Sequence, residues 1–146
     1  MDKLTREAQE HGEIFEAVAL FKKELAEIYK GKKYNSIIKV GNFFEDTIPE
    51  HFEFEEEQIF PDILKKATIN EIKLIEDLRQ EHIDVLKKLD QLKKISSECS
   101  PESDRKQIDT AINFSREILQ IINDHAYKED KKLFPLLKKY GLDLEW

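Results

Sequence analysis

The chain has 146 residues, a net charge of −7 and a pI of about 5.2, and its length suits one domain that spans residues 1–146. Charged residues make up 38% and hydrophobic residues 40% of the chain, with only four Gly and four Pro, which favours long amphipathic helices and argues against a β-sandwich. An acidic chain without a basic stripe is a poor binder of nucleic acid, and no apolar run approaches the roughly 20 residues that a membrane span needs.

The first predicted helix runs from about Asp2 to Tyr29, with Asp2 as its N-cap and Gly31 as its C-terminal stop. Its charged and polar start, MDKLTREAQEHGE, is unlike a signal peptide, so a cytoplasmic protein is the default expectation. At helical spacing, His11 shares one face with several apolar side chains, which we expect to point into the core. These side chains are Leu4, Ala8, Phe15, Val18 and Leu25.

The second predicted helix begins near Asn35 and ends around Pro61, with a short final turn through Leu64. Pro49 lies within it and cannot donate a hydrogen bond to the carbonyl of residue 45, so we expect a kink or bulge there. The alternative is that one helix ends at residue 47 and a new one starts with Pro49 in its first turn. The apolar side chains expected to face inward are Ile37, Val40, Phe44 and Ile48.

Residues 68–71, Thr-Ile-Asn-Glu, fit a capping box, which predicts the start of a third helix. The helix carries an inward stripe around His82 and gives way to a linker at residues 96–103. The linker contains Cys99, the only cysteine, which we expect to be exposed; a single cysteine excludes an internal disulfide, a Cys-rich zinc site and a CxxC redox pair. The stripe consists of Ile75, Leu78, Val85, Leu89 and Leu92.

The fourth predicted helix has Pro101 in its first turn and carries an apolar face to His125 and Glu129. Four helices of about 25–30 residues joined by short turns predict an all-α fold, an antiparallel up-down-up-down four-helix bundle. No stretch alternates with period two for long enough to predict a strand. We expect the apolar tail of the chain to fold back and close one end of the bundle. Its apolar residues are Leu142, Leu144 and Trp146.

A short frame occurs twice in the chain, as HFEFEEEQIFP beginning at His51 and as HAYKEDKKLFP beginning at His125. Each copy has His, then Glu four residues later, then Phe-Pro at the ninth and tenth positions after the His. A helix advances about 100° and 1.5 Å per residue, so His51 and Glu55 lie on one helix face. The same holds for His125 and Glu129. An imidazole and a carboxylate on one face, presented twice, suit an iron or manganese site.

The other two histidines, His11 and His82, each follow a glutamate, so the chain has the order His, His-x3-Glu, His, His-x3-Glu. The step from His11 to His82 is 71 residues and that from His51 to His125 is 74, which is an internal repeat at the level of the whole chain. Counted from the predicted turns, all four imidazoles fall near one level of the core. A lone core histidine is usually held by a hydrogen bond, but four at one level beside two carboxylates indicate a metal site.

Four imidazoles and two carboxylates indicate two metal ions rather than one. The natural division gives His11 and His51 to the first ion. His82 and His125 then belong to the second ion, and two carboxylates together with an oxo or hydroxo group bridge the ions. The acids next to the ligands are expected around the ligands or in solvent. The bridging residues are Glu55 and Glu129, and the neighbouring acids are Glu10, Glu56, Glu81 and Asp130.

Several common catalytic motifs do not occur in the sequence. No histidine has Glu three residues before it, so the ferritin-type Glu-x-x-His ligand pair is missing. The chain has no His-Glu-x-x-His motif of a zinc protease. It has no Gly-rich phosphate loop and no Gly-x-Ser-x-Gly nucleophile motif.

Over most of its length, the sequence resembles the hemerythrin-like (HHE cation-binding) family. The resemblance rests on Glu10-His11, on both copies of the His-x3-Glu and Phe-Pro frame, and on Glu81-His82. It implies a non-haem di-iron centre in a four-helix bundle, with terminal histidines and two bridging carboxylates. Members of the family bind or react with O2, nitric oxide or peroxide, or serve as iron and oxygen sensors. Manganese suits the same donors.

Two features differ from the oxygen-carrying hemerythrins. Those proteins have His-x3-His on the third helix, whereas here Leu78 and Leu86 flank His82 at that spacing. They have His-x4-Asp on the fourth helix, whereas here both Glu129 and Asp130 are available, and the symmetry of the two copies favours Glu129. A site of four histidines and two glutamates is more similar to the repair-of-iron-centres di-iron proteins, which carry an extra Cys-containing N-terminal segment.

Three functions fit these residues. The first, which we predict, is a di-iron protein that binds or senses O2 or nitric oxide, or iron itself. The second is an enzyme that reduces nitric oxide or peroxide, or a protein that donates iron to damaged iron-sulfur centres. The third is a bundle for protein contacts in which the metal is only structural. The sequence leaves open the choice between binding and catalysis, the redox partner, the physiological ligand and the oligomeric state.

Overall fold

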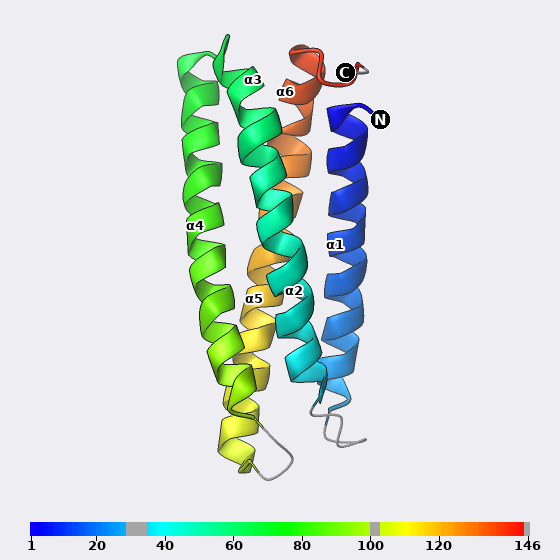
Figure 1. The fold of residues 1–146 in the computed structure, drawn as a ribbon, viewed down its shortest axis with the longest axis vertical. Coiled ribbons are helices and arrows are strands. Elements are labelled where there is room, and N and C mark those ends of the chain that lie inside the picture. Colours follow the sequence, from blue (N-terminus) through cyan, green and yellow to red (C-terminus); the bar gives the residue numbers. More distant parts are fainter. Residues whose placement is uncertain (29–34, 100–102, 145–146) are drawn as a thin grey trace.

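The computed structural model describes residues 1–28, 35–99 and 103–144. Four long helices stand side by side and alternate in direction, so they form an up-down-up-down bundle (Figure 1). The described residues contain no strand, and the predicted all-α bundle is confirmed. None of the described helices combines the length and the apolar character that crossing a membrane requires. The long helices are α1 (Lys3–Ala26), α2 (Asn35–Phe54), α4 (Ile69–Ser97) and α5 (Arg105–Lys132).

Side chains next to the helix starts cap α1 and α4 as predicted. The Asp2 carboxylate accepts the backbone N–H of Thr5 at 2.7 Å, which satisfies a free donor in the first turn of α1. At the start of α4, the N–H of Thr68 donates to the Glu71 carboxylate at 2.9 Å, and the N–H of Glu71 donates to the Thr68 hydroxyl at 3.3 Å. The predicted end of α1 at residues 29–31 lies outside the described residues.

The start of α5 differs from the prediction. Asp104 and Gln107 form a second capping box, and α5 begins at Arg105. Pro101 lies outside the described residues and is not in the first turn of α5, so that prediction was wrong. A carboxylate that accepts a backbone N–H sets this boundary, and the proline does not. Cys99, expected to be exposed, is half-buried and packs against the apolar core.

Proline distorts the second helical segment, but not at the predicted place. α2 continues as an α-helix through Pro49, so neither the bulge nor the new helix start expected there occurs. A π-helical turn follows α2 instead, in which the N–H of Phe60 donates to the carbonyl of Glu55, five residues back. Pro61 accounts for this wider turn, because its ring clashes with the carbonyl four residues before it in a regular helix. The additional elements are η1 (Glu55–Ile59), α3 (Phe60–Leu64) and, after α5, α6 (Phe134–Lys139).

Two apolar clusters fill the bundle, with buried polar side chains between them along every long helix. The larger cluster, here called the apolar layer, runs from Ile14 of α1 to Ile122 of α5 and includes Phe44. The smaller cluster lies at the opposite end and includes Phe60 and Leu137. The buried charged and imidazole side chains between the clusters form what we call the polar layer. They are Glu7 and His11 on α1, His51 on α2, Glu55 on η1, His82 on α4, and His125 and Glu129 on α5.

The chain folds back over the smaller cluster after α6. Gly141 has a φ of +74°, and the N–H of Leu142 donates to the carbonyl of Leu137 at 2.8 Å, which completes a Schellman turn. The carbonyl of Leu142 accepts the N–H of Leu4 at 3.0 Å, so the tail satisfies a free donor in the first turn of α1. The predicted closure is therefore confirmed for one tail residue. Leu142 is buried, Leu144 is 68% exposed, and Trp146 lies outside the described residues.

Candidate metal centre

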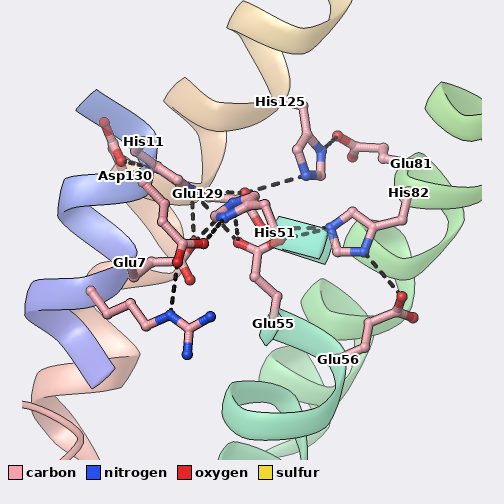
Figure 2. A network of polar contacts seen from close by, with 12 residues as sticks. Glu7, His11, His51, Glu55, Glu56, Glu81, His82, His125, Glu129 and Asp130 are labelled. Atoms are coloured by element: carbon pink, nitrogen blue, oxygen red, sulfur yellow. Dashed lines mark hydrogen bonds and ion pairs between the residues drawn. The ribbon is translucent and has the colours of Figure 1, made fainter. Parts of the chain in front are cut away.

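The polar layer brings together all six residues that the sequence predicts as metal ligands (Figure 2). They come from all four long helices and from η1, and each is at most 5% exposed. In every histidine the Nε2 atom faces carboxylate oxygens inside the bundle. The expected meeting of the four imidazoles at one level is therefore present, and metal ligation itself stays a prediction. The six residues are His11, His51, Glu55, His82, His125 and Glu129.

Glu55 lies between two pairs of histidines. One of its oxygens, Oε2, is 3.3 Å from Nε2 of His51 and 3.6 Å from Nε2 of His11. The other oxygen, Oε1, is 2.9 Å from Nε2 of His82. The two oxygens of one carboxylate therefore face different histidine pairs.

Glu129 holds the corresponding place on α5. Its Oε1 atom is 3.3 Å from Nε2 of both His11 and His125, and its Oε2 atom is 3.9 Å from Nε2 of His82. Like Glu55, it contacts histidines of both pairs. Two carboxylates that each face both pairs are arranged as bridging ligands would be.

The donor atoms fall into two groups, and within each group they all lie within 4.8 Å of one another. Donors about 2.1 Å from one ion and at right angles to each other are about 3.0 Å apart, so the distances above suit ligands of a shared ion. The histidines divide into the same pairs as expected from their order in the chain. The first group is Glu7, His11, His51, Glu55 and Glu129, and the second is Glu55, His82, His125 and Glu129.

Glu7 is a member of the polar layer that the sequence prediction missed. It is fully buried, and its Oε1 atom is 2.7 Å from Nε2 of His11 and 3.4 Å from Nε2 of His51. The prediction placed Ala8 on the inner face of α1, but Ala8 is exposed and Glu7 faces inward instead. A signal was present, because Glu7 and His11 have the same spacing of four residues that placed His51 and Glu55 on one helix face.

A second ring of carboxylates contacts the outer nitrogen of each histidine, and we call these four residues the bracing acids. Each lies next to a predicted ligand in the sequence, and each acts on a histidine of another element. Three of the four distances are hydrogen bonds, and the fourth is longer. The Nδ1 partners are Asp130 for His11 (2.7 Å), Glu10 for His51 (2.7 Å), Glu81 for His125 (2.9 Å) and Glu56 for His82 (3.5 Å).

Three of the bracing acids, Asp130, Glu10 and Glu81, are placed to hold the proton of their histidine on Nδ1. The hydrogen bond from His125 lowers the pKa of Glu81 to about 2, against the effect of burial and with help from Lys128. An ionised Glu81 accepts the Nδ1 proton of His125 and leaves the Nε2 lone pair free to face a metal ion. Without an ion, burial lowers the pKa of His125, but Glu129 and Glu81 outweigh it and raise that pKa to about 9.

Most buried donor and acceptor atoms of the polar layer that face its centre lack a hydrogen-bond partner, as is expected of a cation site. Within the described residues, every buried side-chain nitrogen or oxygen without a hydrogen-bond partner belongs to this layer, apart from one oxygen of Glu24. Burial, together with the charges of Glu129 and Glu7, raises the pKa of Glu55 well above its ordinary value. A buried carboxylate without a compensating charge costs several kcal/mol. Imidazole nitrogens and carboxylate oxygens fit a transition-metal dication, which would satisfy all these atoms.

Comparison with known families agrees with this chemistry. A family model described as Hemerythrin HHE cation binding domain matches residues 3–138. The chain belongs to the hemerythrin family. The match spans every residue of the polar layer, so the buried histidines and glutamates of this hemerythrin domain coincide with a cation-binding assignment. No curated protein and no solved structure matches the chain.

Aromatic rings stack on histidines of both pairs in this hemerythrin domain. Phe52 stacks on His82 with ring centroids 3.8 Å apart and an interplanar angle of 10°, and Phe60 stacks on the same imidazole at 5.7 Å. On the other pair, Phe134 stacks on His11 at 5.4 Å. The shortest of these stacking distances is therefore the one at His82.

A surface pocket of about 270 Å³ lies between α1 and α2 and reaches His51. Glu10, Glu13 and Glu50 are among the residues that line it. Arg6 also lines the pocket and pairs with Glu10 at 2.7 Å. Solvent therefore approaches the polar layer of this hemerythrin domain along an acidic path.

Proposed function

We propose that this hemerythrin domain holds two iron ions in the polar layer and binds or senses O2 or nitric oxide there. The observation that supports this most is the position of Glu55 and Glu129, since each faces both histidine pairs as a bridging carboxylate would. The first ion would have His11 and His51 as terminal ligands, and the second would have His82 and His125.

A bound iron pair with an open coordination position supplies the capacity to bind small diatomic molecules. The chain contributes the orientation of the ligands, because three of the bracing acids would hold the protons on Nδ1 of His11, His51 and His125 and keep those Nε2 atoms free. Phe52 and Phe60 cover His82 and exclude water from that side. Manganese suits the same donors, so the identity of the metal is part of the test.

Donation of iron to damaged iron-sulfur centres is the second candidate function. The acidic pocket between α1 and α2 favours it, because Glu10, Glu13 and Glu50 would attract a cation that enters or leaves beside His51. Reduction of nitric oxide or peroxide would use the same iron pair with an external reductant. Repeated turnover with a reductant would support an enzyme, and transfer of iron to an apo-protein would support a donor.

Elemental analysis of protein purified without oxygen tests the di-iron proposal. We expect two irons per chain and an absorbance change on adding O2 or nitric oxide that reverses when the gas is removed. His51→Ala and His125→Ala should each lower iron content and thermal stability together. Glu16→Gln, at an exposed position of α1, is the control and should change neither.

Two results would contradict the proposal. Full iron loading in both histidine variants would exclude these histidines as ligands. One zinc, or no metal in a well-folded wild-type protein, would exclude the di-iron centre and favour a structural bundle.

A further inference from the structure

Building on the proposed di-iron centre, we propose that Glu7 is a further ligand of the ion held by His11 and His51. The two ions then differ in their protein ligands. The first group of donors has five residues and the second has four. The open position for a small ligand therefore lies on the second ion, beside His82 and His125.

The contacts of Glu7 match those of a ligand. Its Oε1 atom is 2.7 Å from Nε2 of His11 and 3.4 Å from Nε2 of His51, and it lies within 4.8 Å of the other donor atoms of the first group. Both of its oxygens are buried and lack a hydrogen-bond partner. A simple ion pair with His11 would leave the second oxygen unsatisfied, whereas a metal ion compensates the whole carboxylate.

No lysine or arginine pairs with Glu7 within the described residues. Its ion-pair distances are all to histidines. The adjacent Arg6 turns away, pairs with Glu10 at 2.7 Å and places its guanidinium 3.9 Å from the centre of the Phe54 ring. Apart from His11 and His51, the described residues offer Glu7 no cationic partner, and an ion at the centre of the polar layer would supply one.

The internal repeat shows that the second ion has no counterpart of Glu7. His82 lies 71 residues after His11, and the residue 71 positions after Glu7 is Leu78. Leu78 is fully buried in the smaller apolar cluster, and a leucine cannot ligate a metal. The two halves of the centre thus differ by one carboxylate at equivalent positions.

This difference also indicates which ligand the open position accepts. The second ion shares Glu55 and Glu129 with the first and has the stacked rings of Phe52 and Phe60 against His82. An anion that enters beside these rings would lose its hydration. An uncharged diatomic molecule does not meet this penalty.

Three substitutions and one control test the role of Glu7. Glu7→Gln keeps the shape of the side chain and removes its charge. Glu7→Leu introduces the leucine found at the equivalent position beside the second ion, and Leu78→Glu introduces a carboxylate at that equivalent position. Glu16→Gln on α1 is the control, because Glu16 is exposed. The readouts are the Mössbauer spectrum of protein loaded with ⁵⁷Fe(II), the two iron dissociation constants and the amount of nitric oxide bound per chain.

In the wild type and in Glu16→Gln alike, we expect two quadrupole doublets that have equal areas but differ from each other in their Mössbauer parameters. Each chain should bind one nitric oxide. Both Glu7 variants should weaken binding of one iron tenfold or more and make the doublets more alike. Glu7→Leu should bind two nitric oxide molecules, and Leu78→Glu should bind fewer than one. Far-UV circular dichroism of the metal-free variants checks that they fold, and loss of an uncompensated buried carboxylate should favour folding.

Unchanged doublets and iron dissociation constants in both Glu7→Gln and Glu7→Leu would overturn the proposal and leave Glu7 as an ion-pair partner of His11. Nitric oxide binding that weakens in Glu7→Leu would place the open position on the first ion and overturn it as well. A wild type that fails to bind two irons would instead reject the di-iron centre itself, so the two failures are distinguishable.

Discussion

The apolar layer and the polar layer occupy the same four helices but are stabilised by different means. In the apolar layer, Phe44 is fully buried and packs its ring against Phe21 and Phe43, with centroids 5.8 and 5.2 Å away. In the polar layer, carboxylates and imidazole nitrogens face one another with their hydrogen-bonding capacity unmet. The apolar layer is therefore complete with the chain alone, whereas the polar layer reaches its full stability only with bound cations.

The largest expected effect is that of a substitution in the apolar layer, which tests whether the stability of this layer is independent of metal binding in the polar layer. Phe44→Ala should lower the free energy of unfolding by about 3–5 kcal/mol, because it removes a buried ring and leaves a cavity. Since the layer does not depend on metal, the loss should be the same with and without iron in urea denaturation. Ile83→Ala, at a residue that is 47% exposed, is the control and should cost about 0.5 kcal/mol or less. A loss confined to the iron-loaded protein would show that the layers are coupled.

Removal of iron should destabilise the protein only through the polar layer, and the loss in the free energy of unfolding should depend on pH. Chelation should lower the free energy of unfolding by about 4 kcal/mol relative to protein with free iron at about 1,000 times the dissociation constant. In the metal-free protein, His125 has a pKa raised to about 9, so its stabilisation is complete below its ordinary pKa of 6.5 and is lost as the pH rises through 9.

Iron binding has the opposite pH dependence, because it requires neutral imidazoles. The difference in stability between loaded and metal-free protein should therefore widen from about pH 6.5 to 9. Thermal denaturation with and without iron across this range measures it. A difference that narrows with rising pH would contradict the assignment of His125 as a ligand.

The smallest expected effect concerns the bracing acids. Glu81→Gln should weaken iron binding about 10–100-fold, because a neutral amide holds the Nδ1 proton of His125 less firmly than a carboxylate does. Iron titration measures this change, and Asp90→Asn, at an exposed position of the same helix, should leave the affinity unchanged. Equal effects of both substitutions would mean that general surface charge, and not bracing, governs the affinity.

Features encoded by short local patterns could be predicted from the sequence. The capping box of Thr68 and Glu71 was predictable because its hydrogen bonds join residues three apart. The common face of His51 and Glu55 followed from the helical period, and the repeat of the His-x3-Glu frame indicated a paired centre. These inferences needed no knowledge of how the helices pack.

Glu7 and the prolines show why the rest could not be predicted. The spacing of Glu7 from His11 indicated its face of α1, but the docking of α1 decides that this acid is buried while the adjacent Ala8 is exposed. Taken alone, a glutamate on an amphipathic helix is expected in water. Pro49 and Pro61 have the same local chemistry, yet α2 continues through the first and a π-turn precedes the second. The clash of a proline ring with the carbonyl four residues before it is the same at both positions, so it does not predict which proline widens the helix.

The bracing acids also couple the two helical hairpins of the chain. Asp130 of α5 forms a hydrogen bond with His11 of α1, and Glu56 of η1 lies 3.5 Å from Nδ1 of His82 on α4, so each hairpin contacts a histidine of the other. A hairpin that folds alone therefore offers only part of its ligand set in the right tautomer. In the proposed centre, the complete set of ligands is therefore oriented only once the two hairpins have docked.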